Sequence, residues 1–510
     1  MDMVAAPAGT GGIGVAPSTF MPHPTPGIPG SKSNSEEYDQ ITANEFIKVM
    51  SEPLSTFSID VDTASYSNIR RFLNRGQLPP KDAVRIEEMI NYFSYDYAAP
   101  KKDKPFSVQM DFTASPWSKE TKLLRVGLKG REINWQERKA SNLVFLLDVS
   151  GSMNNFNKLP LVKQGLKLMI DSLDEKDRVS IVVYAGASGL VLPATKGSDK
   201  EEIIAALERL SSGGGTNGGA GIELAYAEAQ RNFIKDGINR VILATDGDFN
   251  VGTQSRAALD ELIQEKAKSD VFLTVLGFGS GNLKDSQMES LANKGNGHYA
   301  YIDSYKEAKK VLVEQIGGTM MTIAKDVKIQ VEFNPGRVEA YRLIGYENRL
   351  LAKEDFNDDT KDAGEIGAGH TVTALYEIVP KGGIIPTPKV DDLKYQKTET
   401  HTDKEIQLNE SDEWLTVKLR YKAPNSDRSQ KIEFPLAVKP SIFSQADKDT
   451  QFAAAVASFG MLLRESKYSK ELKFEDIIKM AREAKGEDKK GYRTEFIELV
   501  ERAQKAKSSQ

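Results

Sequence analysis

Three oxygen-bearing side chains, Asp148, Ser150 and Ser152, follow the apolar run 143–147 at every second position. An apolar run of this length is typical of a buried strand in a parallel sheet. An acid and two hydroxyls at this spacing gather hard oxygen donors in one tight loop, which suits Mg²⁺, Ca²⁺ or Mn²⁺ better than zinc or copper. Alone the pattern also fits a simpler interpretation, in which Asp148 caps the next helix and Ser152 begins it.

Two later segments favour the metal site. The glycine-rich run 213–219 carries Thr216, and its glycines allow the backbone to approach an ion closely. A second apolar run, 241–244, leads directly into Thr245 and Asp246. Because the carboxyl ends of parallel strands open into one crevice, we expect Asp246 to meet Asp148 there. Asp248 is either a supporting acid of the same site or an exposed loop residue.

These motifs occur in the order and spacing of the metal-ion-dependent adhesion site, and the chain resembles von Willebrand factor type A domains in this respect. The resemblance implies Mg²⁺ (or Mn²⁺ or Ca²⁺) as the ion and one coordination position open to an Asp or Glu of a protein partner. The implied ligands, the last of them acting through a coordinated water, are Asp148, Ser150, Ser152, Thr216 and Asp246.

Strand and helix patterns alternate between 141 and 317. Such alternation predicts an α/β fold with a doubly wound, mainly parallel six-stranded sheet covered by helices on both faces. The turn 185–189 predicts a hairpin with an antiparallel strand at one edge. Strands are expected at 143–148, 178–185, 190–194, 240–245, 271–278 and 298–302, and helices near 157–172, 199–210, 219–235, 255–268, 285–293 and 304–316.

The region before this domain predicts helices and then strands. Up to 95 the chain is predicted to be mostly helical. Residues 42–45 resemble a capping box before Phe46, and Asp62 or Thr63 can cap a helix that runs through 71. Pro79-Pro80 can begin another helix over 83–93. Period-two patterns at 105–113 and 122–128 then predict half-buried strands. Asp60 and Asp62, near Ser65, are interpreted as a strand end and a helix cap; a cation loop is the alternative.

Beyond 320 the period is again two, which predicts a β-sandwich with strands near 327–333, 338–346, 371–379, 414–421 and 431–438. Neither flank carries enough strands for a sandwich, so we expect one discontinuous β-domain that receives the α/β domain as an insertion. From 446 helices are expected, the first with one apolar face made by Phe452, Val456, Phe459 and Leu463 and the others at 473–484 and 492–506. The expected regions are a disordered leader (1–37), an N-terminal region (38–140), the type A domain (141–317), a β-sandwich-like region (318–440) and a C-terminal helical region (441–510).

The flanks extend the resemblance over nearly all of 38–507. Residues 53–67 and 344–349 are similar to the N-terminal and C-terminal signatures of a bacterial von Willebrand factor A protein family. Such proteins carry an export or lipoprotein signal, and the Gly/Pro/Ala-rich leader lacks the basic start and apolar middle of one. The resemblance therefore implies a signal upstream of the leader and a location in the cell envelope or periplasm, with the cytoplasm as the alternative.

Composition excludes several function classes. The chain of 510 residues has no cysteine and a formal net charge of −5, which excludes thiolate sites and gives no electrostatic case for nucleic acid binding. The sequence contains no transmembrane-length apolar run and no P-loop. The glycine patterns at 9–14 and 213–218 lack the strand-turn-helix context of a dinucleotide site.

Three functions compete on this sequence. A metal-dependent protein-binding module of the cell envelope, without enzymatic activity, is the first. An adaptor subunit that works with a separate ATPase is the second. A hydrolase that uses the metal and the two carboxylates is the third, and Ser150 as its nucleophile would need a base that no neighbouring residue supplies.

Overall fold

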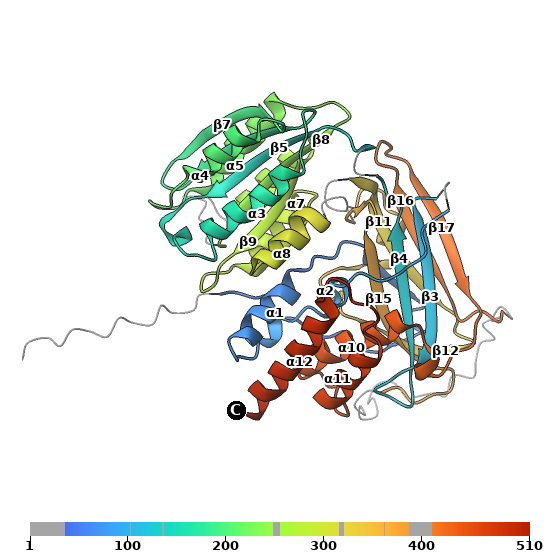
Figure 1. Cartoon of the computed structure of the whole chain (residues 1–510). Helices are drawn as coiled ribbons and strands as arrows, with labels where there is room; N and C mark the ends of the chain where they lie inside the picture. The colour runs from blue at the N-terminus through green and yellow to red at the C-terminus, as the bar shows by residue number, and fades with distance from the viewer. Residues whose placement is uncertain are drawn as a thin grey trace, which may run out of the picture.

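The computed structural model describes residues 36–101, 104–134, 137–247, 256–315, 321–361, 363–386 and 411–509. Residues 1–35 of the predicted leader, with the glycine pattern at 9–14, and Asp248 lie outside these described residues. The last two leader residues are ordered, contrary to the prediction, because Glu36 pairs with Arg71 and Glu37 with Lys284. In Figure 1 an α/β domain, a two-sheet β-domain and a group of helices lie side by side. None of the helices in the described ranges is long and apolar enough to cross a membrane.

The α/β domain is built on one six-stranded sheet in the order β10-β9-β8-β5-β6-β7. All neighbouring strands pair in parallel except β7, which pairs antiparallel with β6 at the sheet edge. This confirms the predicted doubly wound fold and its edge hairpin. The strands are β5 (Ser141–Asp148), β6 (Arg178–Tyr184), β7 (Ser188–Lys196), β8 (Ile238–Thr245), β9 (Phe272–Phe278) and β10 (Tyr299–Ile302).

Helices cover both faces of this sheet, because the central strand β5 is buried at every position and apolar from Leu143 to Leu147. From β5, Leu143, Phe145 and Leu147 pack toward α3, α4 and α8, whereas Val144 and Leu146 pack toward α5, α6 and α7. The helices are α3 (Leu159–Asp171), α4 (Lys200–Glu208), α5 (Gly218–Arg231), α6 (Arg256–Ala267), α7 (Asp285–Lys294) and α8 (Tyr305–Lys309), the last continued by a π-helical turn over Lys310–Glu314.

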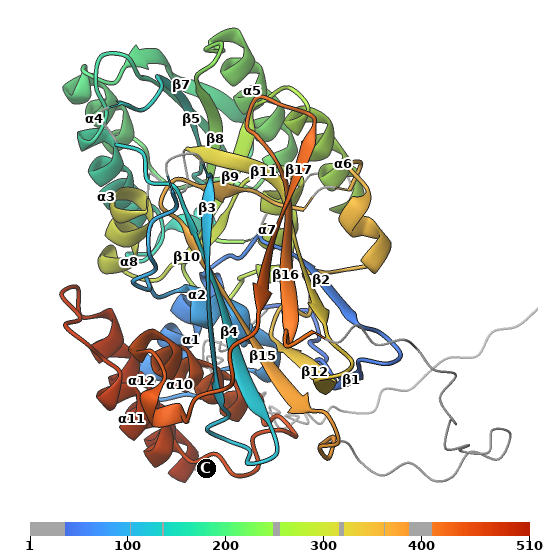
Figure 2. The ribbon, with the colours of Figure 1, turned by 90° about the vertical axis from the view of Figure 1, so that its right-hand side faces the viewer.

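The β-domain consists of two sheets, and each takes strands from both flanks of the α/β domain (Figure 2). Their orders are β1-β12-β15-β4-β3 and β13-β2-β11-β16-β17, and β14 pairs with β11. This pairing confirms the prediction of one discontinuous β-domain with an inserted α/β domain. The strands are β1 (Ile47–Lys48), β2 (Leu54–Ser58), β3 (Phe106–Ala114), β4 (Lys122–Gly130), β11 (Thr322–Phe333), β12 (Val338–Ile344), β13 (Leu350–Leu351), β14 (Ile366–Gly367), β15 (Thr371–Pro380), β16 (Leu415–Lys422) and β17 (Ser429–Leu436).

The region up to 95 is less helical than the sequence suggests. The capping-box pattern begins no helix; Ile47–Lys48 and Leu54–Ser58 instead form strands, because β12 and β11 offer them backbone partners. The expected helix over 83–93 is shortened, since Arg85 is extended and only a 3₁₀ turn precedes it. The helical elements here are α1 (Ala64–Asn74), the 3₁₀ turn Lys81–Ala83 and α2 (Ile86–Asn91).

The C-terminal helices lie where the sequence predicts them, but α10 is not amphipathic. It is buried on every side, since small residues such as Ala454 and Ala457 occupy the face opposite Phe452 and Phe459. A methyl group added at Gly460 would lie 2.9 Å from the side chain of Ile86 in α2, so the two helices touch closely. The helices are α10 (Lys448–Leu463), α11 (Phe474–Glu483) and α12 (Tyr492–Ser508), and 3₁₀ turns lie at Lys353–Asn357 and Phe443–Gln445.

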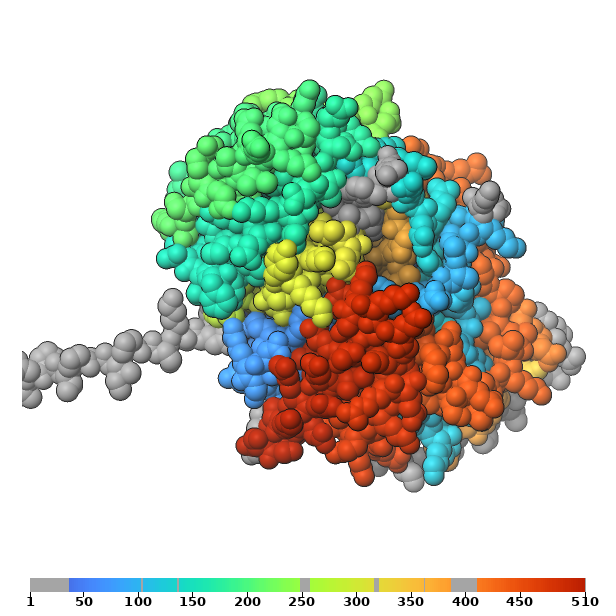
Figure 3. Space-filling view, in the orientation of Figure 1, coloured from blue at the N-terminus to red at the C-terminus, as the bar shows by residue number. Residues whose placement is uncertain are grey.

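Buried ion pairs join the α/β domain to the helices beside it. Arg70 of α1 contacts Asp303 at 2.5 Å and Glu307 at 2.7 Å, both in the α/β domain, and Glu495 of α12 at 3.0 Å. Figure 3 shows the red C-terminal helices lying against the yellow segment that contains α8. The α/β domain is therefore fixed to the body at this end.

Candidate metal centre

Asp148 ends β5 and is completely buried. Its Oδ1 accepts a hydrogen bond from the backbone N–H of Ser150 at 2.8 Å, and its Oδ2 accepts from the hydroxyls of Tyr184 at 3.2 Å and Thr245 at 3.3 Å. These last two residues come from the strands on either side of β5. The neighbouring strands thus orient the carboxylate at the carboxyl edge of the sheet.

The two serines present adjacent oxygens above this carboxylate. Ser150 is buried, Ser152 is exposed, and their hydroxyl oxygens lie 3.0 Å apart. In an octahedral Mg²⁺ site with oxygens about 2.1 Å from the ion, neighbouring ligand oxygens lie about 3.0 Å apart. The spacing and the chemistry of these donors therefore fit a hard divalent cation.

The glycine-rich loop lies against the first motif. The N–H of Gly213 donates to Val149 O at 2.7 Å, and the N–H of Gly151 donates to Gly214 O at 3.1 Å. Gly214 has a φ of +81°, which glycine adopts without strain. Thr216 follows two residues later, half-buried, just before α5. The loop is thereby brought to the same edge as Asp148.

Asp246, one residue beyond β8, is completely buried and contacts a residue that the sequence did not single out. Lys158 Nζ donates to Asp246 Oδ2 at 2.7 Å and to Asn282 Oδ1 at 3.1 Å. Lys158 is itself buried at the N-terminus of α3. No local signal marks this residue, because a lysine without an acid three or four positions away is usually solvated and the partner of Lys158 lies 88 positions along the chain.

The two carboxylates differ in proton affinity. Burial raises the pKa of Asp148 to about 6, with a smaller contribution from the charge of Asp246, although the hydrogen bonds from Ser150 act in the opposite direction. Burial also acts to raise the pKa of Asp246, but the hydrogen bond and charge of Lys158 hold it below the ordinary value. Asp246 is therefore the more firmly ionised of the pair.

Asp60 and Asp62 form neither a helix cap nor an open cation loop. Asp62 accepts from the N–H of Tyr299 at 2.8 Å, and Arg349 contacts Asp62 at 3.1 Å and Asp60 at 3.3 Å. Thr63, not Asp62, occupies the N-cap position of α1. The cap role predicted for Asp62 is thus wrong and the alternative cap, Thr63, takes the position, whereas Asp60 lies two residues after β2 ends at Ser58. A buried arginine from the β-domain holds both acids.

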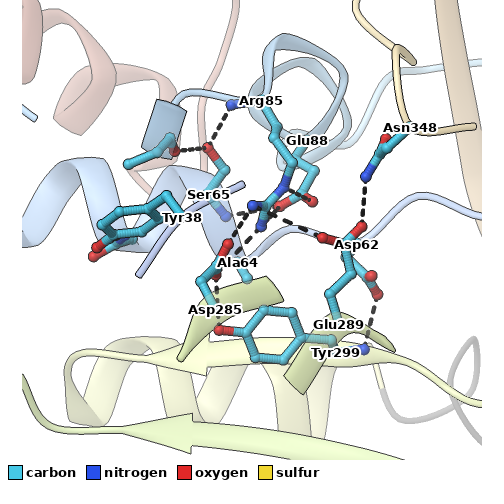
Figure 4. Close-up of polar contacts among 12 residues, drawn as sticks. Tyr38, Asp62, Ala64, Ser65, Arg85, Glu88, Asp285, Glu289, Tyr299 and Asn348 are labelled. Carbon is cyan, nitrogen blue, oxygen red and sulfur yellow. Dashed lines mark hydrogen bonds and ion pairs between the residues drawn. The ribbon is translucent and has the colours of Figure 1, made fainter. Parts of the chain in front are cut away.

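The same network continues across the boundary between the α/β domain and the N-terminal region (Figure 4). Arg85 pairs with Glu88 and with Asp285 of α7, and the hydroxyl of Tyr299 donates to Asp285 at 3.0 Å. Glu88 also accepts from the N–H of Ser65 at 2.7 Å. Acids cluster here closely enough to hold a metal. Arg85 and Arg349 pair with them but do not balance every acid, since burial and the charge of neighbouring acids raise the pKa of Asp62.

Comparison with known proteins supports the resemblance over most of 32–506. Three family descriptions match: "von Willebrand factor" over 32–125, "von Willebrand factor type A domain" over 142–314 and "Uncharacterized protein YfbK, C-terminal" over 318–506. YfbK of Escherichia coli (strain K12) is 44% identical over 473 residues, which is 91% of this chain and 80% of that protein. The chain belongs to the YfbK family of bacterial von Willebrand factor type A proteins.

Other relatives share smaller parts of the chain. Protein sll0103 of Synechocystis sp. is 31% identical over 187 residues, 36% of this chain and 43% of that protein. A solved von Willebrand factor type A protein from Catenulispora acidiphila covers 78% of this chain and 89% of its own, with 14% identity and a TM-score of 0.41.

Membership in this family indicates the general kind of function, protein interaction. Type A domains are protein-interaction modules, generally without enzymatic activity, and they commonly bind a divalent metal at the adhesion-type site. In this YfbK-family chain the candidate residues for such a site are placed together at the carboxyl edge of the sheet by the contacts described above.

Proposed function

We propose that this chain is a divalent-metal-dependent protein-binding module that engages an Asp or Glu side chain of a partner. The ion would be held by Asp148, Ser150, Ser152 and Thr216, with Asp246 acting through a water. Bound there, Mg²⁺, Mn²⁺ or Ca²⁺ supplies an electrophilic site that favours one more anionic oxygen. The observation that carries the proposal is the convergence of oxygen donors at one sheet edge, with two hydroxyl oxygens 3.0 Å apart.

The protein's own residues prepare this edge for a partner. Asp148 is fixed by hydrogen bonds and buried, so it cannot itself reach a partner, whereas Ser152 is exposed at the surface. Lys158 neutralises Asp246, so the edge carries little net negative charge that would repel a carboxylate. A charge-assisted contact in a partly dehydrated interface is then expected to dominate affinity.

Metal binding is the first part to test. Isothermal titration of the full chain with Mg²⁺ and Mn²⁺ should show one site, which is lost in Asp148→Ala and weakened in Thr216→Ala. Asp171→Ala is the matched control, since that acid is exposed at the end of α3. Equal binding by wild type and Asp148→Ala would refute the proposed site.

Partner binding is the second part. A phage-displayed library of random heptapeptides is selected on the immobilised chain in Mg²⁺ and released at low pH, so that metal-dependent and metal-independent binders are both recovered. We expect enriched peptides that contain Asp or Glu, lose binding when that acid is replaced by Asn or Gln, and do not bind Asp148→Ala. Enriched peptides that bind equally well in EDTA would exclude the adhesion-type mechanism and direct attention to the β-domain or the helices.

We also propose that the protein works without catalysis and at the cell envelope. Hydrolysis of generic esters or phosphates in Mg²⁺, if it were lost in Asp148→Ala, would contradict the first statement. The absence of cysteine suits an exported protein that avoids stray thiols and a cytosolic protein alike, so the proposed location rests on the family resemblance. Fractionation of cells that express the native gene tests the location, and recovery in the cytosol alone would contradict it.

A further inference from the structure

A large apolar side chain is exposed beside the candidate metal centre. Phe156 has 83% of its surface accessible, the highest value among the large apolar side chains of the described residues. It lies in the short loop between the 3₁₀ turn Gly151–Met153, which contains Ser152, and helix α3. Single exposed apolar residues are common, so the position of this one must carry the argument.

The loop that carries Phe156 is anchored at both ends. On one side the N–H of Asn154 donates to Gly151 O at 3.3 Å, and on the other the N–H of Lys158 donates to Asn155 O at 3.0 Å. The Lys158 side chain then pairs with Asp246. The aromatic ring is therefore presented by a backbone tied to the metal centre itself, and little conformational entropy is lost when a partner covers it.

Two other loops at this edge, both among the described residues, offer small side chains. The turn after β6 reads Ala185-Gly186-Ala187, and the loop before α5 contains three consecutive glycines, 213–215. These two loops touch, since a methyl group added at Gly214 would lie 3.5 Å from Gly186 N. The backbone of a partner can approach these two loops closely, because their side chains are small. Phe156, in the loop before α3, adds a large apolar side chain near the same edge.

We propose that Phe156 is the apolar contact of the partner-binding face, and that the partner presents an acidic side chain with a large apolar side chain one or two positions away. Phe156 is four residues from Ser152, so their Cα atoms lie at most about 14 Å apart. An extended peptide advances about 3.3 Å per residue, so one or two residues of the partner, together with the length of its side chains, can cover the distance between Ser152 and Phe156. This inference rests on the proposed function and specifies the partner segment that the site selects.

The test compares peptides and variants on the full chain. The probe is the Mg²⁺-dependent heptapeptide selection described above, repeated on wild type, Phe156→Ser and the control Phe233→Ser. Phe233 is also exposed, at 42%, but it lies near the amino end of β8, away from the metal centre. Peptides selected on wild type should carry Leu, Ile, Phe, Met or Trp within two positions of the acid.

These peptides should bind Phe156→Ser roughly tenfold or more weakly, as expected for a central aromatic contact, and Phe233→Ser as well as wild type. Mg²⁺ titration should be the same for all three proteins, which shows that the centre is intact. Acidic peptides without an apolar neighbour, or equal binding to Phe156→Ser, would overturn the role of Phe156 and leave the metal-dependent function standing. If no selected peptide depends on Mg²⁺, the proposed function fails and this inference fails with it.

Discussion

Replacing Lys158 by methionine tests how the metal centre is balanced electrostatically. Lys158 is 6% exposed and Asp246 is completely buried, so solvent screens their 2.7 Å contact weakly. Removing one partner of a buried ion pair costs about 3–5 kcal/mol, because the other charge stays buried without compensation. Asp246 retains hydrogen bonds from Asn282 and Ser152, which places the expected loss near the lower end, about 3 kcal/mol.

Lys158→Met should lower the stability of the protein but raise its affinity for divalent ions. At an assumed separation of about 6 Å, a lysine charge repels a divalent ion by about 1.4 kcal/mol even at the dielectric constant of water, which equals a tenfold difference in affinity. Lys158→Met should therefore bind Mg²⁺ roughly tenfold or more tightly than wild type. Since a bound ion also compensates Asp246, the stability loss should be smaller in Mg²⁺ than in EDTA.

Thermal unfolding in EDTA and in Mg²⁺, with isothermal titration, measures both effects. For an α/β domain of this size, a loss of about 3 kcal/mol corresponds to a decrease in melting temperature of roughly 6–12 °C. Lys167→Met on the same helix is the control, because Lys167 and Glu208 form an exposed pair worth about 0–1 kcal/mol. An unchanged transition of Lys158→Met in EDTA, or weaker Mg²⁺ binding, would refute this reasoning.

Three further results are expected. Asp148→Ala should lose Mg²⁺ binding in titration calorimetry while its stability changes by about 1 kcal/mol. In wild type the affinity for Mg²⁺ should fall as the pH drops through about 6, because protons then compete with the ion for Asp148. An Mg²⁺ affinity that stays constant between pH 5 and 7.5 would contradict this. Burial, with the nearby charge of Glu347, raises the pKa of Glu87 from 4.5 to about 8. The folded state then binds the extra proton, and stability falls by up to about 4 kcal/mol as pH rises from 4.5 to 8. Glu87→Gln should lack this fall and be more stable than wild type at pH 8; an identical pH dependence of urea unfolding in wild type and variant would argue against it. Fragments 38–135 and 320–440 should fold only together, as circular dichroism of the single and mixed fragments can show, because each sheet needs strands from both.

Much of the α/β domain follows from local patterns. The apolar run of β5, the alternation of strand and helix, and the hairpin before β7 are local signals, and they fix the sheet and its carboxyl edge. The motif from Asp148 to Ser152 lies within five residues, so its geometry depends mainly on one turn. The pairing of the two β-flanks was also predictable, because neither flank has enough strands to form a sandwich alone.

Contacts between residues distant in the chain decided the remaining strand pairing and the charge pairs. No local pattern reveals that β2 pairs with β11, because the backbone partners of Leu54–Ser58 in β11 are 270 or more positions away. The same holds for Arg349, which holds Asp60 and Asp62, and for Lys158, which meets Asp246 only when two loops at the sheet edge come together. The sequence by itself determined the α/β fold, because that fold follows from periodicity. It also offered the candidate ligands of the centre, of which Asp148, Ser150 and Ser152 share one short motif and Thr216 and Asp246 are implied by the resemblance to type A domains. The tertiary structure alone decided which charges neutralise one another, since that depends on burial and on partners distant in the chain.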